Sequence, residues 1–486
     1  MPEKKVKSII PDVPLYGTKK EKPEVKADDK KFSPKSKAAP APEKEKKKEA
    51  PAMPEINKET ISNAVKTSNI PMILMIFVML VFGLVILYSV SGPDAYGQFK
   101  DSSWFLTRQI RFTVVGIVLM LVLSFIPIDL FRRPWVGIVC YVISLMLAVA
   151  TLALGVGREH GASRWINIGP IQLQSSEIIK VALIMAFAGY RSTISKLRSE
   201  GRIRQPKSKS RRRLVNAMLD FIVPVAFCIL VDVVIILQPH VSCFIIVAAV
   251  IFMCALVSEI PGKSWATGIL VLAIVGGIGG GLAFALAPAA KKESLMKNYA
   301  HVFKRLAIFT ASDEELDNED EGLTRDDTRQ VDNAHNALGS GGMWGVGLGN
   351  SRSKYNYVSE AQNDYIFSIY VEETGFVGGL ILMLMYLLMF VMCVIVCWRA
   401  KDVFSRTIAT GCTTLIFVEV LMNFSVELQV IPATGVTLPF ISYGGTAQIM
   451  LLIAYGLILS VSRSGTVYEE KKKRLQSKRK ALKQGA

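Results

Sequence analysis

Long apolar runs occupy most of this 486-residue chain and constrain its fold more than any other feature. A helix needs about 20 apolar residues to cross the hydrocarbon core of a bilayer, whereas a helix of a soluble domain carries its apolar residues on one face. Ten runs approach that length, at residues 70–90, 112–128, 135–156, 178–190, 217–237, 241–258, 265–288, 365–398, 406–430 and 444–462. We therefore predict an all-α polytopic membrane protein with about ten transmembrane helices.

Basic residues predict the orientation of these helices. The loop at 191–213 carries ten Lys and Arg, and the segments at 129–133, 399–406 and 464–486 are basic too. Loops rich in Lys and Arg stay in the cytoplasm, so ten spans place both termini there. The long loop at 290–363, between the seventh and eighth predicted helices, is then extracytoplasmic. The net charge of +17 reflects this topology rather than nucleic-acid binding.

The composition divides the chain into three parts. Residues 1–69 hold seventeen Lys against eleven acidic residues and no apolar run, which is typical of a disordered basic cytoplasmic tail. A ten-span membrane domain follows at 70–463, and a second basic cytoplasmic tail at 464–486. The extracytoplasmic loop contains an acidic insert at 313–327 with nine acidic residues, which we expect to be solvated.

Ionisable residues inside the predicted spans are costly and therefore paired or functional. They are Glu177, Lys180, Asp220, Asp232, His240, Glu419 and Glu427. Glu177 and Lys180 are three residues apart, so they can pair on one helix face; a role in substrate binding is equally open. The four His residues show no paired spacing, which argues against a dedicated zinc site.

Asp364 closes the extracytoplasmic loop immediately before the eighth predicted helix. An Asp at a helix start accepts backbone N–H groups and is stabilised by the helix dipole, so a cap is the expectation from local chemistry alone. Asn363 can cap equally well, however, which leaves catalysis open for Asp364. The nearby stretch at 339–350 is dense in glycine and allows close backbone approach to a ligand such as a phosphate, although it lacks the ending of a nucleotide-binding loop.

Several motifs occur in the order found in one known family. The segments Arg164-Trp-Ile-Asn-Ile-Gly169 and Gln174-Ser-Ser-Glu-Ile-Ile-Lys180 resemble its RWI-x-x-G and QPSE-x-x-K signatures. The stretch Pro432-Ala-Thr-Gly-Val-Thr-Leu-Pro-Phe-Ile-Ser-Tyr-Gly-Gly445 is similar to its C-terminal signature. On these motifs the chain resembles the SEDS proteins (shape, elongation, division and sporulation), the peptidoglycan glycosyltransferases FtsW, RodA and SpoVE, over roughly residues 70–465.

The resemblance implies an enzyme with ten spans that polymerises lipid II, the undecaprenyl-pyrophosphate-linked disaccharide peptide, beside a class B penicillin-binding protein. The family's catalytic Asp precedes a Phe-Ile-Phe segment, and the matching residues are Asp364-Tyr-Ile-Phe367, which makes Asp364 the expected general base. The matched motifs also imply a set of substrate-binding residues: Arg164, Trp165, Glu177, Lys180, Lys354, Glu360, Ser442 and Tyr443.

The chain departs from the family pattern at several positions. Ser175 and Ser359 replace prolines, Gln362 replaces a frequent His, and His240 stands where many members have Asp. Glu419 and Glu427 occupy positions that are usually uncharged. No departure falls on Asp364 itself. A pyrophosphate leaving group is compatible with Mg²⁺ or another divalent cation, but the motifs hold no obvious carboxylate cluster for one.

Two other functions fit the same predicted architecture. A lipid II flippase would use ten spans and intramembrane charges, and a non-catalytic scaffold would only recruit the penicillin-binding protein. Within the family, a division role of the FtsW or SpoVE type is favoured over an elongation role. The expected location is the bacterial plasma membrane, at the division septum, with other divisome or elongasome membrane proteins as further partners and no nucleic acid.

Overall fold

The computed structural model describes residues 69–155, 165–168, 171–238, 240–286, 325–355 and 361–484, together with isolated positions at 306, 307, 309 and 358. Residues 1–68 of the predicted N-terminal tail and most of the acidic insert lie outside these described residues, and so do Arg164, Ser359 and Glu360.

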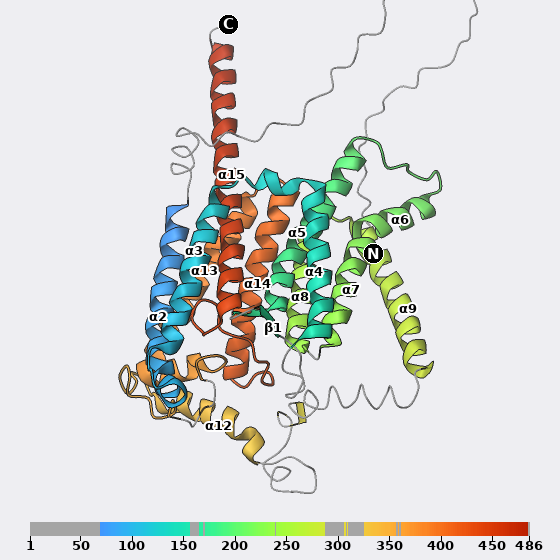
Figure 1. Cartoon of the computed structure of the whole chain (residues 1–486). Helices are drawn as coiled ribbons and strands as arrows, with labels where there is room; N and C mark the ends of the chain where they lie inside the picture. Colours follow the sequence, from blue (N-terminus) through green and yellow to red (C-terminus); the bar gives the residue numbers. More distant parts are fainter. Residues whose placement is uncertain are drawn as a thin grey trace, which may run out of the picture. The chain divides into compact units, whose positions relative to one another are not determined.

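The described part is a bundle of long helices (Figure 1). Its first half contains α2 (Ile70–Phe99), α3 (Trp104–Phe125), η1 (Ile128–Arg132), α4 (Pro134–Leu154), α5 (Ser175–Ser199), α6 (Lys209–Ala217), η3 (Met218–Ile222) and α7 (Val223–Ile236). Its second half contains α8 (Val241–Val257), α9 (Gly262–Leu286), α12 (Arg325–Ser340), α13 (Ile366–Arg399), α14 (Val403–Glu427) and α15 (Gly445–Gln484).

Each of the ten predicted runs coincides with a helix or with the continuous segment α6–η3–α7. Among the described residues, eight helices are long and apolar enough to cross a membrane, and Val241–Val257 and Gly262–Ile274 are shorter apolar helices. The polytopic helical fold is therefore confirmed. The polar-flanked run at 178–190 forms the middle of the 25-residue α5, because its many buried residues pack against α4 and α14.

Helix α14 lies at the centre of the packing. It contacts α5, α8, α13 and α15, while α3 lies along α15 and α4 along α5 (Figure 1). Most of its side chains are buried by these neighbours. Polar residues on α14 are therefore shielded from lipid and water, and several of them bond to other helices or loops.

A short β-hairpin, which the prediction of an all-α protein did not include, precedes α5. Strand β1 (Trp165–Ile168) pairs antiparallel with β2 (Ile171–Gln174), with Trp165 opposite Gln174. The hairpin contacts the start of α15, where Thr446 Oγ1 accepts from the Gln174 N–H at 3.3 Å. The hairpin thus lies at the end of the bundle where α15 begins.

Helix α13 is broken at Gly375, whose backbone has φ 74° and ψ −175°. The glycine-rich loop supplies hydrogen-bond partners for the backbone groups that the break leaves without a helical partner. The carbonyls of Glu372 and Glu373 accept from the N–H groups of Val346 and Gly347 at 3.0 and 2.9 Å. In return, the N–H groups of residues 376 and 377 donate to the carbonyls of residues 342 and 343 at 2.8 and 3.2 Å. The glycines of this loop therefore serve close approach to a helix backbone.

Candidate active site

Asp364 ends a tight turn, residues 361–364, just before α13 begins at Ile366. Its side chain is half-buried and points toward the loop that joins α14 to α15. A Cβ atom built on Gly435 of that loop would lie 3.4 Å from Asp364 Oδ2, and Gly435 has φ 69°. The carboxylate therefore faces the C-terminal signature motif, which was the most specific of the motifs in the sequence.

Two side chains hold this turn in place. Asn423, on α14, donates from Nδ2 to the Asp364 carbonyl and to the Val436 carbonyl, each at 2.9 Å. The Gln362 side chain donates to Asp94 Oδ2 on α2 at 2.8 Å. Because one amide bonds to both segments, Asn423 fixes the distance between the Asp364 turn and the signature loop. Gln362, a departure from the family pattern, thereby links the turn to α2.

The start of α13 is capped by a residue that comes from another helix. Glu427 Oε1 accepts from the Phe367 N–H at 3.2 Å, and its Oε2 accepts from the Ser368 N–H at 2.5 Å and the Ser368 hydroxyl at 2.6 Å. These are among the first N–H groups of α13, which have no partner within the helix. The capping task that local chemistry assigned to Asp364 or Asn363 is therefore performed by Glu427 at these two amides.

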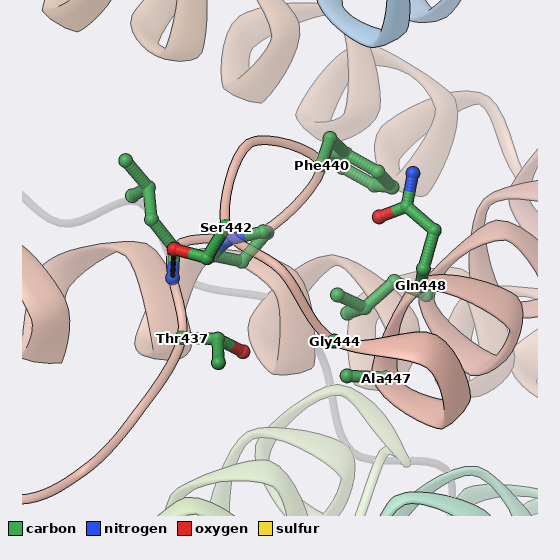
Figure 2. A pocket seen from close by; sticks show the side chains of 9 residues that line it. Thr437, Phe440, Ser442, Gly444, Ala447 and Gln448 are labelled. Carbon is green, nitrogen blue, oxygen red and sulfur yellow. Dashed lines mark hydrogen bonds between the residues drawn. The ribbon is translucent and has the colours of Figure 1, made fainter. Parts of the chain in front are cut away.

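The signature loop is held by its own polar residues. The Ser442 hydroxyl accepts from the Leu438 N–H at 2.9 Å, as the dashed line in Figure 2 shows. The Tyr443 N–H donates to the Gln362 carbonyl at 2.9 Å, which joins the loop to the Asp364 turn. The hollow beside Ser442 in Figure 2, lined also by Phe440 and Gln448, is too narrow for a water molecule. Ser442 is thus buried within the loop.

Tyr443 presents its ring at the edge of the signature loop. The ring packs edge-on against Phe105 of α3, with centroids 4.9 Å apart. Burial raises the pKa of the Tyr443 hydroxyl, while a hydrogen bond and the charge of Arg108 oppose this rise. The exposed Arg108 guanidinium in turn lies 3.9 Å from the Trp104 ring centroid. Aromatic residues and a cation therefore gather next to the signature loop.

Lys354, a predicted substrate-binding residue, is buried in an ion pair. Its Nζ lies 2.8 Å from Glu373 Oε1 and 3.2 Å from the Ser89 carbonyl of α2. The Ser89 hydroxyl also donates to Glu373 Oε2 at 2.6 Å. Lys354 therefore joins the glycine-rich loop region, α2 and α13 at the same end of the bundle as Asp364.

Lys180 lies between two carboxylates inside the bundle. The predicted pair with Glu177 is confirmed, with Nζ 2.8 Å from Oε2. Glu419 of α14 forms a second ion pair with the same ammonium group. All three side chains are buried. Glu419, a departure from the family pattern, therefore completes an interhelical cluster that fixes α5 against α14.

The remaining predicted residues lie near the same end or outside the described residues. Trp165 is half-buried in β1, on the hairpin that contacts α15. Ser175, where the family has proline, accepts a hydrogen bond at 2.5 Å from the Thr151 hydroxyl of α4. Within the part of the chain that the structure describes, no three His, Cys, Asp or Glu side chains gather as ligands for a metal ion.

The family model described as "Cell cycle protein", which represents FtsW, RodA and SpoVE, matches residues 70–466. The chain belongs to this family. It is 30% identical over 392 residues to the "Probable peptidoglycan glycosyltransferase FtsW" of Trichlorobacter lovleyi, covering 80% of this chain and 92% of that protein. It is also 30% identical over 403 residues to the stage V sporulation protein E of Bacillus subtilis, covering 82% of this chain and 98% of that protein.

Solved structures show the same fold. The chain matches a peptidoglycan synthase complex, described as coordinating polymerization and crosslinking, with a TM-score of 0.55 at 21% identity, covering 82% of this chain and 98% of that one. It matches the rod shape determining protein RodA of Thermus thermophilus with a TM-score of 0.52 at 22% identity, covering 82% of this chain and 97% of that one.

Sequence reasoning missed the parts of the site that depend on tertiary contacts. Glu427 and Glu419 were recognised as intramembrane charges, but their partners on α13 and α5 could not be read from spacing. Asn423 carries a weaker signal, a single amide in an apolar run. An amide at that position must bond to backbone from another segment, and this requirement was the available clue.

Proposed function

We propose that this protein is a peptidoglycan glycosyltransferase that polymerises lipid II, with Asp364 as the general base. Its relatives are named as such enzymes. The observation that carries the assignment of Asp364 is the cap supplied by Glu427 at Phe367 and Ser368. With these amides bonded to another carboxylate, the Asp364 side chain faces the signature loop at Gly435.

The reaction needs one base and no covalent nucleophile. The C4 hydroxyl of the acceptor sugar attacks C1 of the donor sugar, the C1–O bond to undecaprenyl pyrophosphate breaks, and the hydroxyl proton passes to Asp364. The α linkage of the donor becomes a β linkage in a single inverting displacement. A single carboxylate near the attacking hydroxyl therefore suffices, unlike the carboxylate pair of a hydrolase.

The leaving pyrophosphate requires positive charge. We propose Arg164, together with Trp165 of the hairpin, as its first contact, and Tyr443, Ser442 and Glu360 as residues that shape the acceptor groove. Lys180 and Lys354 are already bonded to Glu177, Glu419 and Glu373. Their part in binding the diphosphate, and that of Glu177, is therefore indirect: each ammonium group is largely neutralised by its partners and holds together the segments that carry the site.

We propose that both termini lie in the cytoplasm and that the Asp364 end of the bundle lies on the outer face, where lipid II is presented; the Lys- and Arg-rich loops support this orientation. A class B penicillin-binding protein is the proposed partner, supported by the fold shared with a synthase complex that joins polymerization to crosslinking. A role in division at the septum is supported by the FtsW and sporulation relatives.

The test is polymerisation of purified lipid II by the purified protein, with and without its class B penicillin-binding protein. We expect Asp364→Asn to abolish glycan synthesis and to leave membrane insertion intact. Asp129→Asn is the matched control, because this exposed carboxylate pairs with Arg132 and lies in η1, far along the chain from the site.

Full polymer yield from Asp364→Asn would refute the assignment. Transport of lipid II across vesicles by wild type and variant alike, without chain lengthening by either, would favour the flippase. Absence of both activities from the wild-type protein, with recruitment of the penicillin-binding protein retained, would favour the scaffold.

A further inference from the structure

The glycine-rich loop carries four large apolar side chains that the described part of the structure leaves exposed. Trp344 is the most exposed of them, at 77%. The stretch from residue 336 to residue 351, in which they lie, contains no charged residue. A group of exposed apolar side chains of this kind marks a surface that meets a membrane or another protein. We call these four side chains the apolar loop face: Met343, Trp344, Val346 and Leu348.

Helix α13 shows where a bilayer lies relative to this loop. Between Glu373 and Arg399 the helix contains no charged residue. Exposed large apolar side chains recur along that stretch from Phe376 to Trp398. These two residues are about 33 Å apart along a helix that rises about 1.5 Å per residue, and the hydrocarbon core of a bilayer is about 30 Å thick. Phe376 and Trp398 therefore mark the two edges of the membrane-spanning part of α13.

The apolar loop face is fixed at the edge that Phe376 marks. The Phe376 N–H donates to the Gly342 carbonyl at 2.8 Å. Gly345 packs so closely against α13 that a Cβ atom there would collide with the Glu373 carbonyl oxygen. Trp344 lies in the chain between these two contacts, so it is held at the same level as the end of the apolar span.

We propose that the apolar loop face binds a lipid surface. Its side chains enter the bilayer leaflet on the Asp364 side of the protein, at the level of the headgroups and the first acyl carbons. Trp side chains gather at this level because one end of the ring is apolar and the other donates a hydrogen bond. The first charged residue after the uncharged stretch is Arg352, which is exposed and suits the layer of lipid phosphates.

Continuity with α13 favours lipid over a protein partner. Phe376 is exposed and bonds to the loop through its backbone, so the lipid-facing surface of α13 continues onto the apolar loop face. The loop is also bonded to α13 without any partner chain, and it therefore meets the leaflet in a fixed conformation. The inference does not depend on the catalytic role proposed for Asp364.

The fluorescence of Trp344 tests this inference in the full-length protein, reconstituted into vesicles of phosphatidylethanolamine and phosphatidylglycerol. Its contribution is the emission of wild type minus that of Trp344→Phe. One set of vesicles carries bromine near the headgroup end of the acyl chains, and a second carries it near the chain ends. Iodide on both sides of the vesicle reports contact with water. We expect shallow bromine to remove roughly half of the Trp344 emission, and deep bromine and iodide to remove much less, because Trp residues lie at the membrane interface.

Trp398→Phe is the matched control. Trp398 is 81% exposed and lies at the other edge of the same span, so shallow bromine should also quench it more than deep bromine does. Where Trp344→Phe is too unstable to reconstitute, Trp344→Tyr allows the same subtraction, because Tyr emits at shorter wavelength.

Strong quenching of Trp344 by iodide and none by bromine would place the loop in water and overturn the inference. Protection from both quenchers would mean that protein covers the apolar loop face, and would overturn it too. Bromine quenching that disappears when the class B penicillin-binding protein is added would assign the face to that partner instead. Each of these results leaves the proposed function standing as long as Asp364→Asn is inactive, since the quenching is measured without substrate.

Discussion

The variant Lys354→Met tests whether Lys354 stabilises the fold through its ion pair with Glu373 or binds the substrate. The Lys354 and Glu373 side chains are only 3% and 1% exposed, with Nζ 2.8 Å from Oε1. Removing one partner of a buried ion pair costs about 3–5 kcal/mol, because the other charge is left uncompensated. The Ser89 hydroxyl still donates to Glu373 at 2.6 Å, so we expect a value near the lower end, about 3 kcal/mol.

Hydrogen exchange of the glycine-rich loop measures this cost directly. The N–H groups of Val346 and Gly347 donate to carbonyls of Glu372 and Glu373, so they exchange when the loop leaves α13. A loss of about 3 kcal/mol in local stability speeds their exchange roughly 150-fold. In the double variant Lys354→Met, Glu373→Gln, no charge remains unpaired, and we expect slower exchange than in the single variant.

Two results would refute this reasoning. If Lys354→Met leaves the exchange of Val346 and Gly347 unchanged, the ion pair does not hold the loop. If exchange is unchanged and polymerisation is lost, Lys354 acts on the substrate.

Two further predictions concern backbone strain and pH. Gly375→Ala should abolish activity and expose the glycine-rich loop to protease, because φ is 74° and the new Cβ would lie 2.4 Å from the Met343 carbonyl oxygen. Burial acts to raise the pKa of Asp402, but hydrogen bonds from the Ser405 N–H and Arg132 outweigh it and lower that pKa. Stability from Asp402 is therefore present above the ordinary Asp value of about 4 and is lost as pH falls through the lowered value; thermal unfolding of Asp402→Asn should differ from wild type at pH 7 and converge with it once the pH falls below the lowered pKa of Asp402.

The helices were predictable from sequence because a bilayer imposes a length and a composition on each span. The run at 178–190 underestimates the length of this helix, because α5 continues to Ser199 with polar residues that pack on protein. A long apolar run indicates a helix that faces lipid. Helix α5 packs mostly against other helices, so it can carry polar residues and its apolar run is shorter than the helix. The β-hairpin was missed because four-residue strands between two spans leave no periodic signal.

The site was predictable only where chemistry is local. The pair between Glu177 and Lys180 follows from helix geometry, and the structure has it. The partner of Glu427 lies about sixty residues away, at Ser368, and no spacing rule reaches that far. Local helix rules therefore could not find Glu427, which caps the Phe367 and Ser368 amides of α13 from the end of another helix.

The break at Gly375 has a consequence for protein engineering. The four backbone hydrogen bonds that replace the helical ones there run between α13 and residues 342–347. Helix α13 and the loop at residues 342–347 therefore need to come from the same protein, although a turn separates them in the sequence. A chimaera could take α13 from a relative without that relative's residues 341–354. Four backbone groups of α13 would then lose their hydrogen-bond partners, and each one that water cannot reach would destabilise the fold by several kcal/mol. Exchange at 341–377 as a single block should preserve folding, and this block is a natural boundary for grafting between family members.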